Sequence, residues 1–285
     1  MEFQERVKQE LQRLVARFAA GEAEVVRTYF ARPRTKEQDL AWLKRQAGRE
    51  LGTARSVVEN LVKASGSLDK GVPRRDFESM ARALLEEVRH YRLLADLIEE
   101  LQGAPVDPDE LMRYGVWARN PELPENNAHI DLVKRLRREK GELADLALSF
   151  FEGGGAGIFI AGSQVAGGAL EQRIAEAMKV IAEDELRHGP VHLPRAAAQI
   201  TDEAMFREVR QIVWEQGMQH LRLRNETFGY PLSEERLREI GEGKIEPMPI
   251  DYFGITPGSP YSPDTGGQHP LTALDLIPQA QQGPS

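Results

Sequence analysis

The sequence contains no cysteine. This absence excludes disulfides, zinc fingers, iron–sulfur clusters and thiol nucleophiles. Any metal ion must therefore be held by carboxylates and by some of the six histidines. Positive charge is also scarce, because 37 basic and 45 acidic side chains give a net charge of −8. A nucleic-acid partner is not expected, since binding phosphates requires a basic surface. The N-terminal residues lack the apolar core of a signal peptide, which favours a cytoplasmic location.

Long hydrophobic runs are nearly absent as well. The exception is the segment 146–170, in which Glu152 is the one charged residue. Its length would span a bilayer. However, glycines and polar side chains interrupt it, and a carboxylate lies inside it. We interpret the segment as a buried core helix that runs into a glycine-rich turn, and we do not expect a membrane partner.

The remaining apolar residues recur with helical spacing, and no stretch alternates as a strand would. The first predicted helix ends near Gly21, and Gly189 and Pro190 end or kink the fifth. The predicted helices span about 3–21, 35–64, 73–102, 131–163, 168–188 and 201–227. From about residue 241 prolines accumulate, which indicates an extended tail on the body or on a neighbouring subunit, with disorder as the alternative. We therefore expect an all-α domain over 1–240 and a proline-rich tail over 241–285.

Two short segments nearly repeat each other: Glu-Glu-Val-Arg-His over 86–90 and Asp-Glu-Leu-Arg-His over 184–188. A Glu and a His three residues apart lie on the same side of a helix, so both can reach one metal ion. Glu87 and Glu185 each fall within the apolar stripe of their helix. An acid that points into a core is costly unless a cation or hydrogen bonds compensate it. A metal is the simplest compensation; a lattice of ion pairs with Arg89 or Arg187 is the structural alternative.

In a bundle with this pair of motifs, one further glutamate is needed from each of two other helices. Glu152 is the obvious choice in the second helical hairpin, because no other charge lies in its segment. In the first hairpin, Glu50 lies 14 residues before Ala64 and Glu87 lies 14 residues after Pro73, so the two are level. Glu59 is the alternative on the same helix, but it lies only five residues before Ala64 and shares its face with Gly52 and Arg55. Four glutamates and two histidines would leave two metal ions with open positions for oxygen or peroxide.

As a set, these motifs resemble the ferritin-like diiron-carboxylate superfamily, which includes the ribonucleotide reductase small subunit, the bacterial multicomponent monooxygenases, rubrerythrins and manganese catalases. The resemblance covers about 40–190. It implies one metal ion on Glu50, Glu87 and His90 and a second on Glu152, Glu185 and His188. It also implies that Glu87 and Glu185 bridge the ions. Glu86 and Asp184 would not bind the metal ions themselves but would orient the ligand histidines.

The resemblance predicts a ferritin-like four-helix bundle, with additional helices and the extended C-terminal tail that the composition indicates. It also predicts a non-haem diiron oxidase or monooxygenase that uses O2 to oxidise a small organic substrate, with a reductase as candidate electron donor. A homo-oligomeric assembly is expected from the tail and from the general habit of helical bundles. The expected cofactor is two iron ions, with manganese or a mixed manganese–iron pair as alternatives. The alternative functions are a manganese catalase or rubrerythrin-like peroxidase acting on hydrogen peroxide, and a non-enzymatic binding protein.

A few further residues are candidates for the same site. His192 lies four residues beyond His188 and is a candidate extra ligand, as is Glu59. Because Pro190 lies between the two histidines, a surface position or a supporting role behind a ligand is the favoured alternative for His192. Phe151, Gly155 and Phe159 are candidates to line an apolar pocket beside the metal ions, with ordinary core packing as the alternative.

Overall fold

The computed structural model describes residues 2–151, 156–251 and 253, with backbone only for 187–192. Over these residues the chain is helical and contains no strand, so the all-α prediction is confirmed. The elements are α1 (Phe3–Phe30), α2 (Lys36–Ser65), α3 (Arg74–Gln102), α4 (Pro108–Met112), α5 (Pro124–Lys140), α6 (Glu142–Leu148), the 3-10 helix η1 (Ser149–Phe151), α7 (Ala156–Gly162), α8 (Ala169–Ala198), α9 (Glu203–Thr227) and α10 (Glu234–Gly241).

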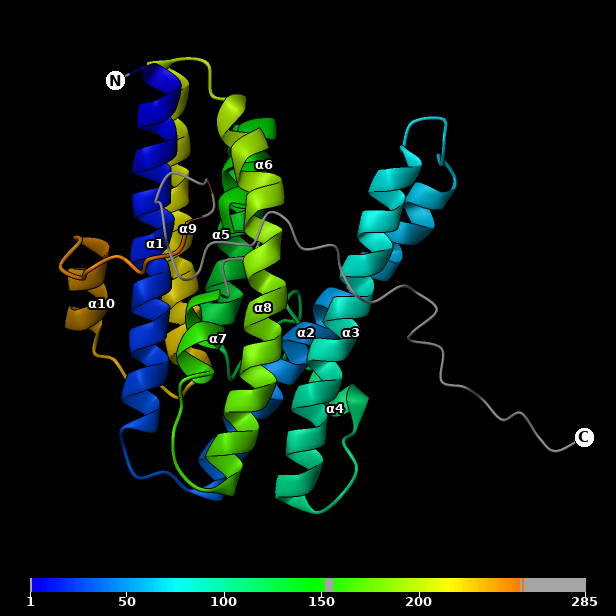
Figure 1. The fold of residues 1–285 in the computed structure, drawn as a ribbon, viewed down its shortest axis with the longest axis vertical. Helices are drawn as coiled ribbons and strands as arrows, with labels where there is room; N and C mark the ends of the chain where they lie inside the picture. Colours follow the sequence, from blue (N-terminus) through cyan, green and yellow to red (C-terminus); the bar gives the residue numbers. More distant parts are fainter. Residues whose placement is uncertain (1, 152–155, 252, 254–285) are drawn as a thin grey trace, which may run out of the picture.

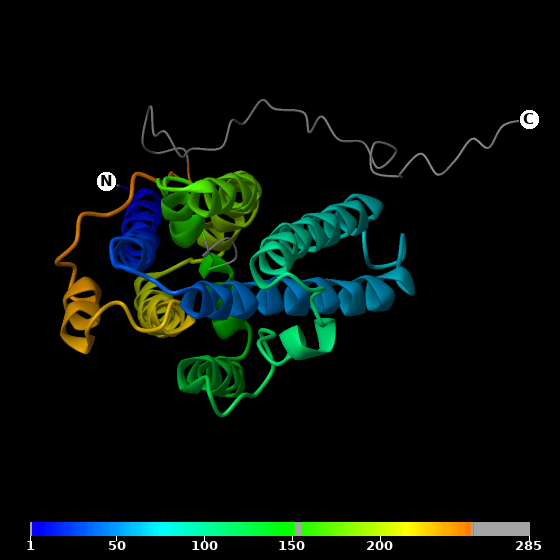
Figure 2. The ribbon, with the colours of Figure 1, turned by 90° about the horizontal axis from the view of Figure 1, so that it is seen from below.

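The helices form a bundle in which α8 lies between two groups. On one side α2 packs along α3, and α3 contacts α8; on the other side α7 packs between α8 and α1, and α1 lies beside α9 (Figure 1). The far end of the α2–α3 hairpin extends beyond the rest of the bundle in both views (Figures 1 and 2). The α2–α3–α8 contact brings the two Glu-x-x-His segments, on α3 and α8, into one region of the core.

The first helix is longer than predicted. It continues past Gly21 to Phe30, because Gly21 permits close helix packing and does not act as a stop signal. A β-carbon at Gly21 would lie 2.8 Å from Ile240 Cγ2 and 3.2 Å from Leu221 Cδ1. The helix α1 thus reaches the start of α2 and spans the length of the bundle.

The single helix predicted over 131–163 is wrong. Helix α5 ends at Gly141, whose φ of 54° lies in the left-handed region that favours glycine, and α6, η1 and α7 follow as short pieces. By length and composition the segment Glu142–Gly162 could cross a membrane, but 57% of its most apolar window is buried inside the structure. This burial agrees with its interpretation as a core segment.

Helix α8 does not end near His188 as predicted but continues through Gly189 and Pro190 to Ala198. Proline in a helix interior costs about 3 kcal/mol. The last turns of α8 offset that cost by burying Leu193, Ala196 and Ala197, each at most 4% exposed. Tertiary packing therefore overrides the local stop signal.

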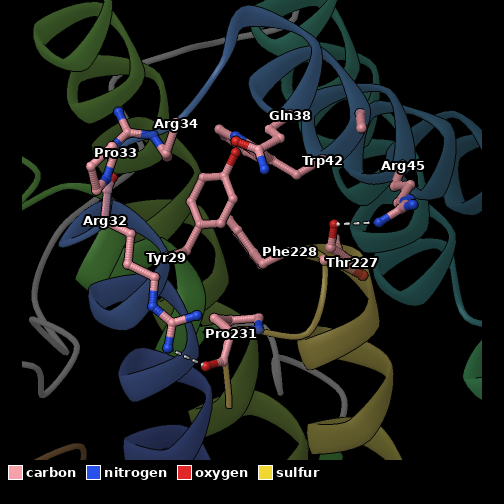
Figure 3. A pocket seen from close by; sticks show the side chains of 12 residues that line it. Tyr29, Arg32, Pro33, Arg34, Gln38, Trp42, Arg45, Thr227, Phe228 and Pro231 are labelled. Atoms are coloured by element: carbon pink, nitrogen blue, oxygen red, sulfur yellow. Dashed lines mark hydrogen bonds between the residues drawn. The ribbon is translucent and has the colours of Figure 1, made fainter. Parts of the chain in front are cut away.

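An aromatic cluster fixes the start of α2 against α1 and α9 (Figure 3). Trp42 stacks on Phe228 with ring centroids 5.0 Å apart, and Tyr29 packs edge-on against both. Buried Asp39 accepts hydrogen bonds from Tyr29 Oη and Trp42 Nε1. Arg34 joins Asp39 to Glu171 at the start of α8. Because α2 and α8 are tied at this end, the residues further along them have a fixed relative position.

The start of the predicted tail lies on the body of the protein. The Met248 amide donates to the Ala16 carbonyl over 3.0 Å, and Ile250 is 2% exposed. The predicted extended conformation of 254–285 lies outside the described residues.

Candidate metal centre

Three side chains from two helices meet in the core. Glu50 comes from α2, and Glu87 and His90 come from successive turns of α3. Each offers one ligand atom, and these three atoms all lie within 4.8 Å of one another. His90 Nδ1 is 3.7 Å from Glu50 Oε2 and 4.0 Å from Glu87 Oε2. All three residues are buried, with His90 fully enclosed. Carboxylate and imidazole at this spacing can hold a metal ion.

Helix α8 completes the surroundings of His90. The Asp184 carboxylate lies 3.0 Å from His90 Nε2 and is 2% exposed. Glu185 Oε1 approaches the opposite ring nitrogen, Nδ1, to 4.0 Å. With Asp184 accepting a hydrogen from Nε2, the Nδ1 atom faces three glutamates and can present its lone pair to a metal ion.

The centre contains polar atoms that the protein itself leaves unsatisfied. Among the described residues, Glu87 Oε2 and His90 Nδ1 are fully buried and have no hydrogen-bond partner. Buried polar atoms are nearly always paired, because an unpaired one costs about 1–3 kcal/mol. Both atoms are metal-ligand types, and they face each other. This observation fits a site built for a cation.

The acids and the histidine perturb each other strongly. Burial and the nearby charges of Glu50 and Glu185 raise the pKa of Glu87 to about 10. Burial lowers the pKa of His90, but the hydrogen bond with Asp184 and the charges of Glu50 and Glu185 outweigh it and raise the value to about 11. Burial also opposes ionisation of Glu50, yet the neighbouring His90 holds its pKa below the ordinary value. Without metal, the group is therefore a neutral Glu87, a charged His90 and an ionised Glu50 at pH 7.

Glu50 is oriented by a buried chain of side chains behind it. Gln46 lies one turn earlier on α2 and donates from Nε2 to Glu50 Oε1 over 2.5 Å. Arg224 of α9 donates to Gln46 Oε1 over 3.0 Å. Because arginine can only donate, Gln46 must turn its oxygen toward Arg224 and its amide hydrogens toward Glu50. The sequence analysis predicted neither residue. Gln46 lies four residues before Glu50, and this helical spacing is a weak indication that the two side chains meet. No pattern in the sequence connects Arg224 to Glu50.

The structure separates the two candidates on α2. Glu50 is 5% exposed and lies with Glu87 and His90. Glu59 is exposed and nine residues further along α2, or about 13 Å at the rise of an α-helix. The prediction of Glu59 as a further ligand is therefore wrong, because its side chain does not lie with this group.

The second predicted half of the centre is described only in part. Glu185 lies beside His90, as given above, and Glu86 is half-buried. Glu152 and Gly155 lie outside the described residues, as do the side chains of His188 and His192. The ligand set proposed for a second metal ion thus stays a prediction.

The two candidate pocket phenylalanines, Phe151 and Phe159, pack in the core. Phe159 is 2% exposed. Phe151 is half-buried, with its ring 6.3 Å from Phe18 and 6.0 Å from His220. Their surroundings are those of packed core residues.

The alternative of an arginine-paired lattice can be followed for Arg89, whereas the side chain of Arg187 lies outside the described residues. Arg89 Nη1 lies 3.7 Å from Asp184 Oδ2. Among the described residues, no arginine or lysine forms an ion pair with Glu50 or Glu87. Arg89 thus contacts the acid behind His90, and the two buried glutamates depend on other partners.

A separate buried pair of titratable side chains lies where α1 meets α9. Glu22 Oε1 is 2.6 Å from His220 Nδ1, and burial raises the pKa of Glu22 to about 8. His129 lies within α5, 5.9 Å from the His220 ring.

Replacing Asp184 with asparagine tests its role behind His90. We expect affinity for iron(II) or manganese(II) to fall roughly 10–100-fold, because such outer hydrogen bonds hold a ligand histidine in position and strengthen it as a base. Isothermal titration calorimetry measures the change. Asp96→Asn is the matched control on α3, since Asp96 pairs with exposed Arg92. Equal affinities for the two variants would show that Asp184 does not act on the centre.

The pKa values predict how the metal-free protein responds to pH. Between about pH 7.5 and 8.5, Glu87 and His90 keep their protons in the folded state, whereas both lose them on unfolding. The native state then binds more protons, so stability falls as pH rises. Glu22 adds to the fall up to about pH 8. Urea unfolding in EDTA at about pH 7.5, 8 and 8.5 measures the change of stability with pH. Glu87→Gln should make this change smaller by the contribution of about one proton. A flat or rising stability would contradict the assignment.

Comparisons with protein-family models, with curated proteins and with solved structures found no match. Function is therefore inferred from the geometry of the buried group of Glu50, Glu87, His90, Asp184 and Glu185.

Proposed function

We propose that the chain is a ferritin-like protein that holds a dinuclear carboxylate centre and acts as an oxidase or monooxygenase on a small organic substrate. The observation that carries the proposal is the pair of buried, unpartnered ligand atoms, Glu87 Oε2 and His90 Nδ1, within 4.0 Å of each other. In a purely structural network, buried polar atoms are nearly always paired. In the proposed bundle the four core helices are α2, α3, α8 and the segment that contains α6 and α7.

Each described residue has a separate part in the proposed centre. Glu50, Glu87 and His90 would hold one metal ion, with Glu185 beside them as a candidate bridge to the second. Asp184 would hold the hydrogen on His90 Nε2, so that Nδ1 is the atom that gives up its proton to bind the metal. Gln46 fixes the Glu50 carboxylate by a hydrogen bond. When bound, the metal ions supply the electrons and the oxygen-binding positions that side chains lack.

Loading the centre requires two proton losses. Without metal, Glu87 carries a proton because its pKa is about 10, and His90 carries two because its pKa is about 11. A bound cation takes the place of both labile protons, since ligands must be deprotonated. The surrounding burial excludes bulk water and strengthens the attraction between the cation and the carboxylates.

Metal analysis of the purified protein tests the proposal first. We expect about two iron ions per chain after anaerobic reconstitution with iron(II), as in a dinuclear carboxylate site. About two manganese ions in the protein as isolated, together with oxygen release from hydrogen peroxide, would favour the catalase alternative. No bound iron or manganese after reconstitution would mean that the buried group is structural.

The second test separates the oxygen-using enzyme from a binding protein. Stopped-flow mixing of the iron(II)-loaded protein with O2 should consume O2 and oxidise the iron within a single turnover. The Glu87→Gln variant should consume O2 no faster than the same concentration of free iron(II) does. Stable iron(II) in the wild-type protein under air would contradict an oxygen-activating role.

A further inference from the structure

A groove lies between α1 and α9, where the two helices run side by side (Figure 1). Its volume is about 440 Å³, within the usual range for small-molecule sites. It is lined by Leu14, Arg17, Arg207, Arg210, Gln211 and Trp214. None of these residues belongs to the proposed metal centre.

Positive charge gathers at this groove, although the whole chain carries a net charge of −8. Arg17 is partly buried there, and burial together with the charges of Arg210 and Arg13 lowers its pKa. Such mutual repulsion disfavours the arrangement unless an anion offsets it. Glu10 is the one carboxylate in ion-pair contact with these arginines among the described residues, 3.5 Å from Arg210 Nε. Arg13 and Arg207 have no ion-pair partner in the described part of the chain.

The nearby acids of α9 do not neutralise the arginines that line the groove. Each of three such acids has another cation: Glu203 pairs with Arg6, Glu208 with Lys140 and Glu215 with Arg135. The lining itself contains three arginines and no carboxylate. A set of this size suits a compact polyanion.

The indole ring of Trp214 lines the groove together with the guanidinium groups. Trp214 is 38% exposed, and its Nε1 donates to the Gly241 carbonyl over 3.1 Å. Arg17 donates to the same carbonyl over 3.3 Å. The indole is therefore held in place while part of its surface stays open to a ligand. An anchored indole of this kind suits stacking on a flat ring.

In a second hollow lined by arginines, the arginines already have partners within the protein. The hollow of about 250 Å³ at the start of α2 includes Arg32, Arg34 and Arg45 (Figure 3). Arg34 pairs with Asp39 and Glu171, and Arg32 and Arg45 donate to carbonyls near the end of α9. Those arginines join helix ends, whereas Arg207, which lines the α1–α9 groove, has no ion-pair partner in the described part of the chain.

We propose that the α1–α9 groove binds a compact phosphorylated ligand with a flat ring, of the nucleoside diphosphate class. Arg17, Arg207 and Arg210 would hold the phosphates, because guanidinium forks match phosphate oxygens. Trp214 would stack on the ring. The site is independent of the metal centre.

Isothermal titration of the full-length protein with ADP, pyrophosphate and adenosine at 0.15 M salt tests the proposal. We expect saturable binding of ADP, competition by pyrophosphate and no binding of adenosine alone. The exposed double variant Arg207→Gln/Arg210→Gln should weaken ADP binding about tenfold or more, and Trp214→Phe should weaken ADP more than pyrophosphate. Arg75→Gln/Arg82→Gln, on exposed turns of α3, is the matched charge control.

Three outcomes would overturn the proposal. The first is no saturable binding of either anion by the folded protein. The second is ADP binding that the Arg207→Gln/Arg210→Gln variant leaves unchanged. The third is a short poly-glutamate peptide that binds more tightly than ADP, which would assign the groove to an acidic protein partner. Metal content should be the same in all variants, so failure here is distinct from failure of the proposed function.

Discussion

Glu87→Gln should remove metal binding and leave the metal-free protein at least as stable as the wild type. A lost ligand should lower metal affinity by more than about 100-fold, since even outer hydrogen-bonding residues contribute 10–100-fold. The stability expectation has a separate cause. Glu87 is neutral in the metal-free protein, with a pKa of about 10. Glutamine is also neutral, and its amide can donate to Glu50 as the neutral carboxyl does. Metal content and urea unfolding in EDTA at pH 8 measure the two effects.

Two glutamates on α2 supply the comparison for this result. Glu50→Gln removes a carboxylate from the buried group and should also lose metal. Glu59→Gln makes the same chemical change at an exposed position on the same helix and should keep it. If Glu87→Gln unfolds the metal-free protein, the carboxylate is a structural partner. If Glu59→Gln loses metal and Glu50→Gln does not, the ligand assigned on α2 is wrong.

Gly48→Ala should destabilise the protein by about 3 kcal/mol, a typical cost of overpacking a core. Gly48 lies inside α2, where alanine would ordinarily stabilise by about 1 kcal/mol. Here the added β-carbon would overlap the Leu111 carbonyl oxygen and lie 2.7 Å from Tyr114 Cβ. The oxygen belongs to the backbone and cannot swing aside, so α2 and the segment after α3 would have to separate. Thermal unfolding should show Tm lower by roughly 5–10 °C.

Gly66→Ala is the control for this substitution. Gly66 caps the same helix in the right-handed helical region, and the nearest atom to an added β-carbon is 3.6 Å away. We expect its Tm to stay unchanged or rise slightly. Equal Tm values for the two variants would show that α2 does not pack closely on the Leu111 segment.

The all-α fold class and the group of Glu50, Glu87 and His90 were largely predictable, because they follow from helical periodicity over short stretches of the sequence. Glu87 and His90 lie three residues apart in an apolar stripe, so one turn of helix places them together whatever the rest of the chain does. Glu50 required one further step, the antiparallel alignment of two helices joined by a short loop. That alignment has few solutions, and the buried Glu50 agrees with it.

Several local signals were misleading because the same residue type serves different purposes. Gly21 and Gly141 look alike in the sequence, but Gly21 permits helix contact and Gly141 takes a positive φ that breaks a helix. Pro190 has a strong tendency to end helices, yet α8 continues because its last turns are buried. Which role applies depends on what packs against each residue, and a single sequence does not contain that information.

By itself, the sequence determined that the protein is helical, that any metal must be bound by oxygen and nitrogen, and that Glu87 and His90 share a helix face. Only the tertiary structure decided that Asp184 supports the histidine of a different helix, 94 residues away. It also decided that Arg224 sets the orientation of Gln46 from a distance of 178 residues along the chain. The physical reason is range: helical periodicity acts over a few residues, whereas the partners of a buried polar atom are chosen by whichever helices exclude water around it.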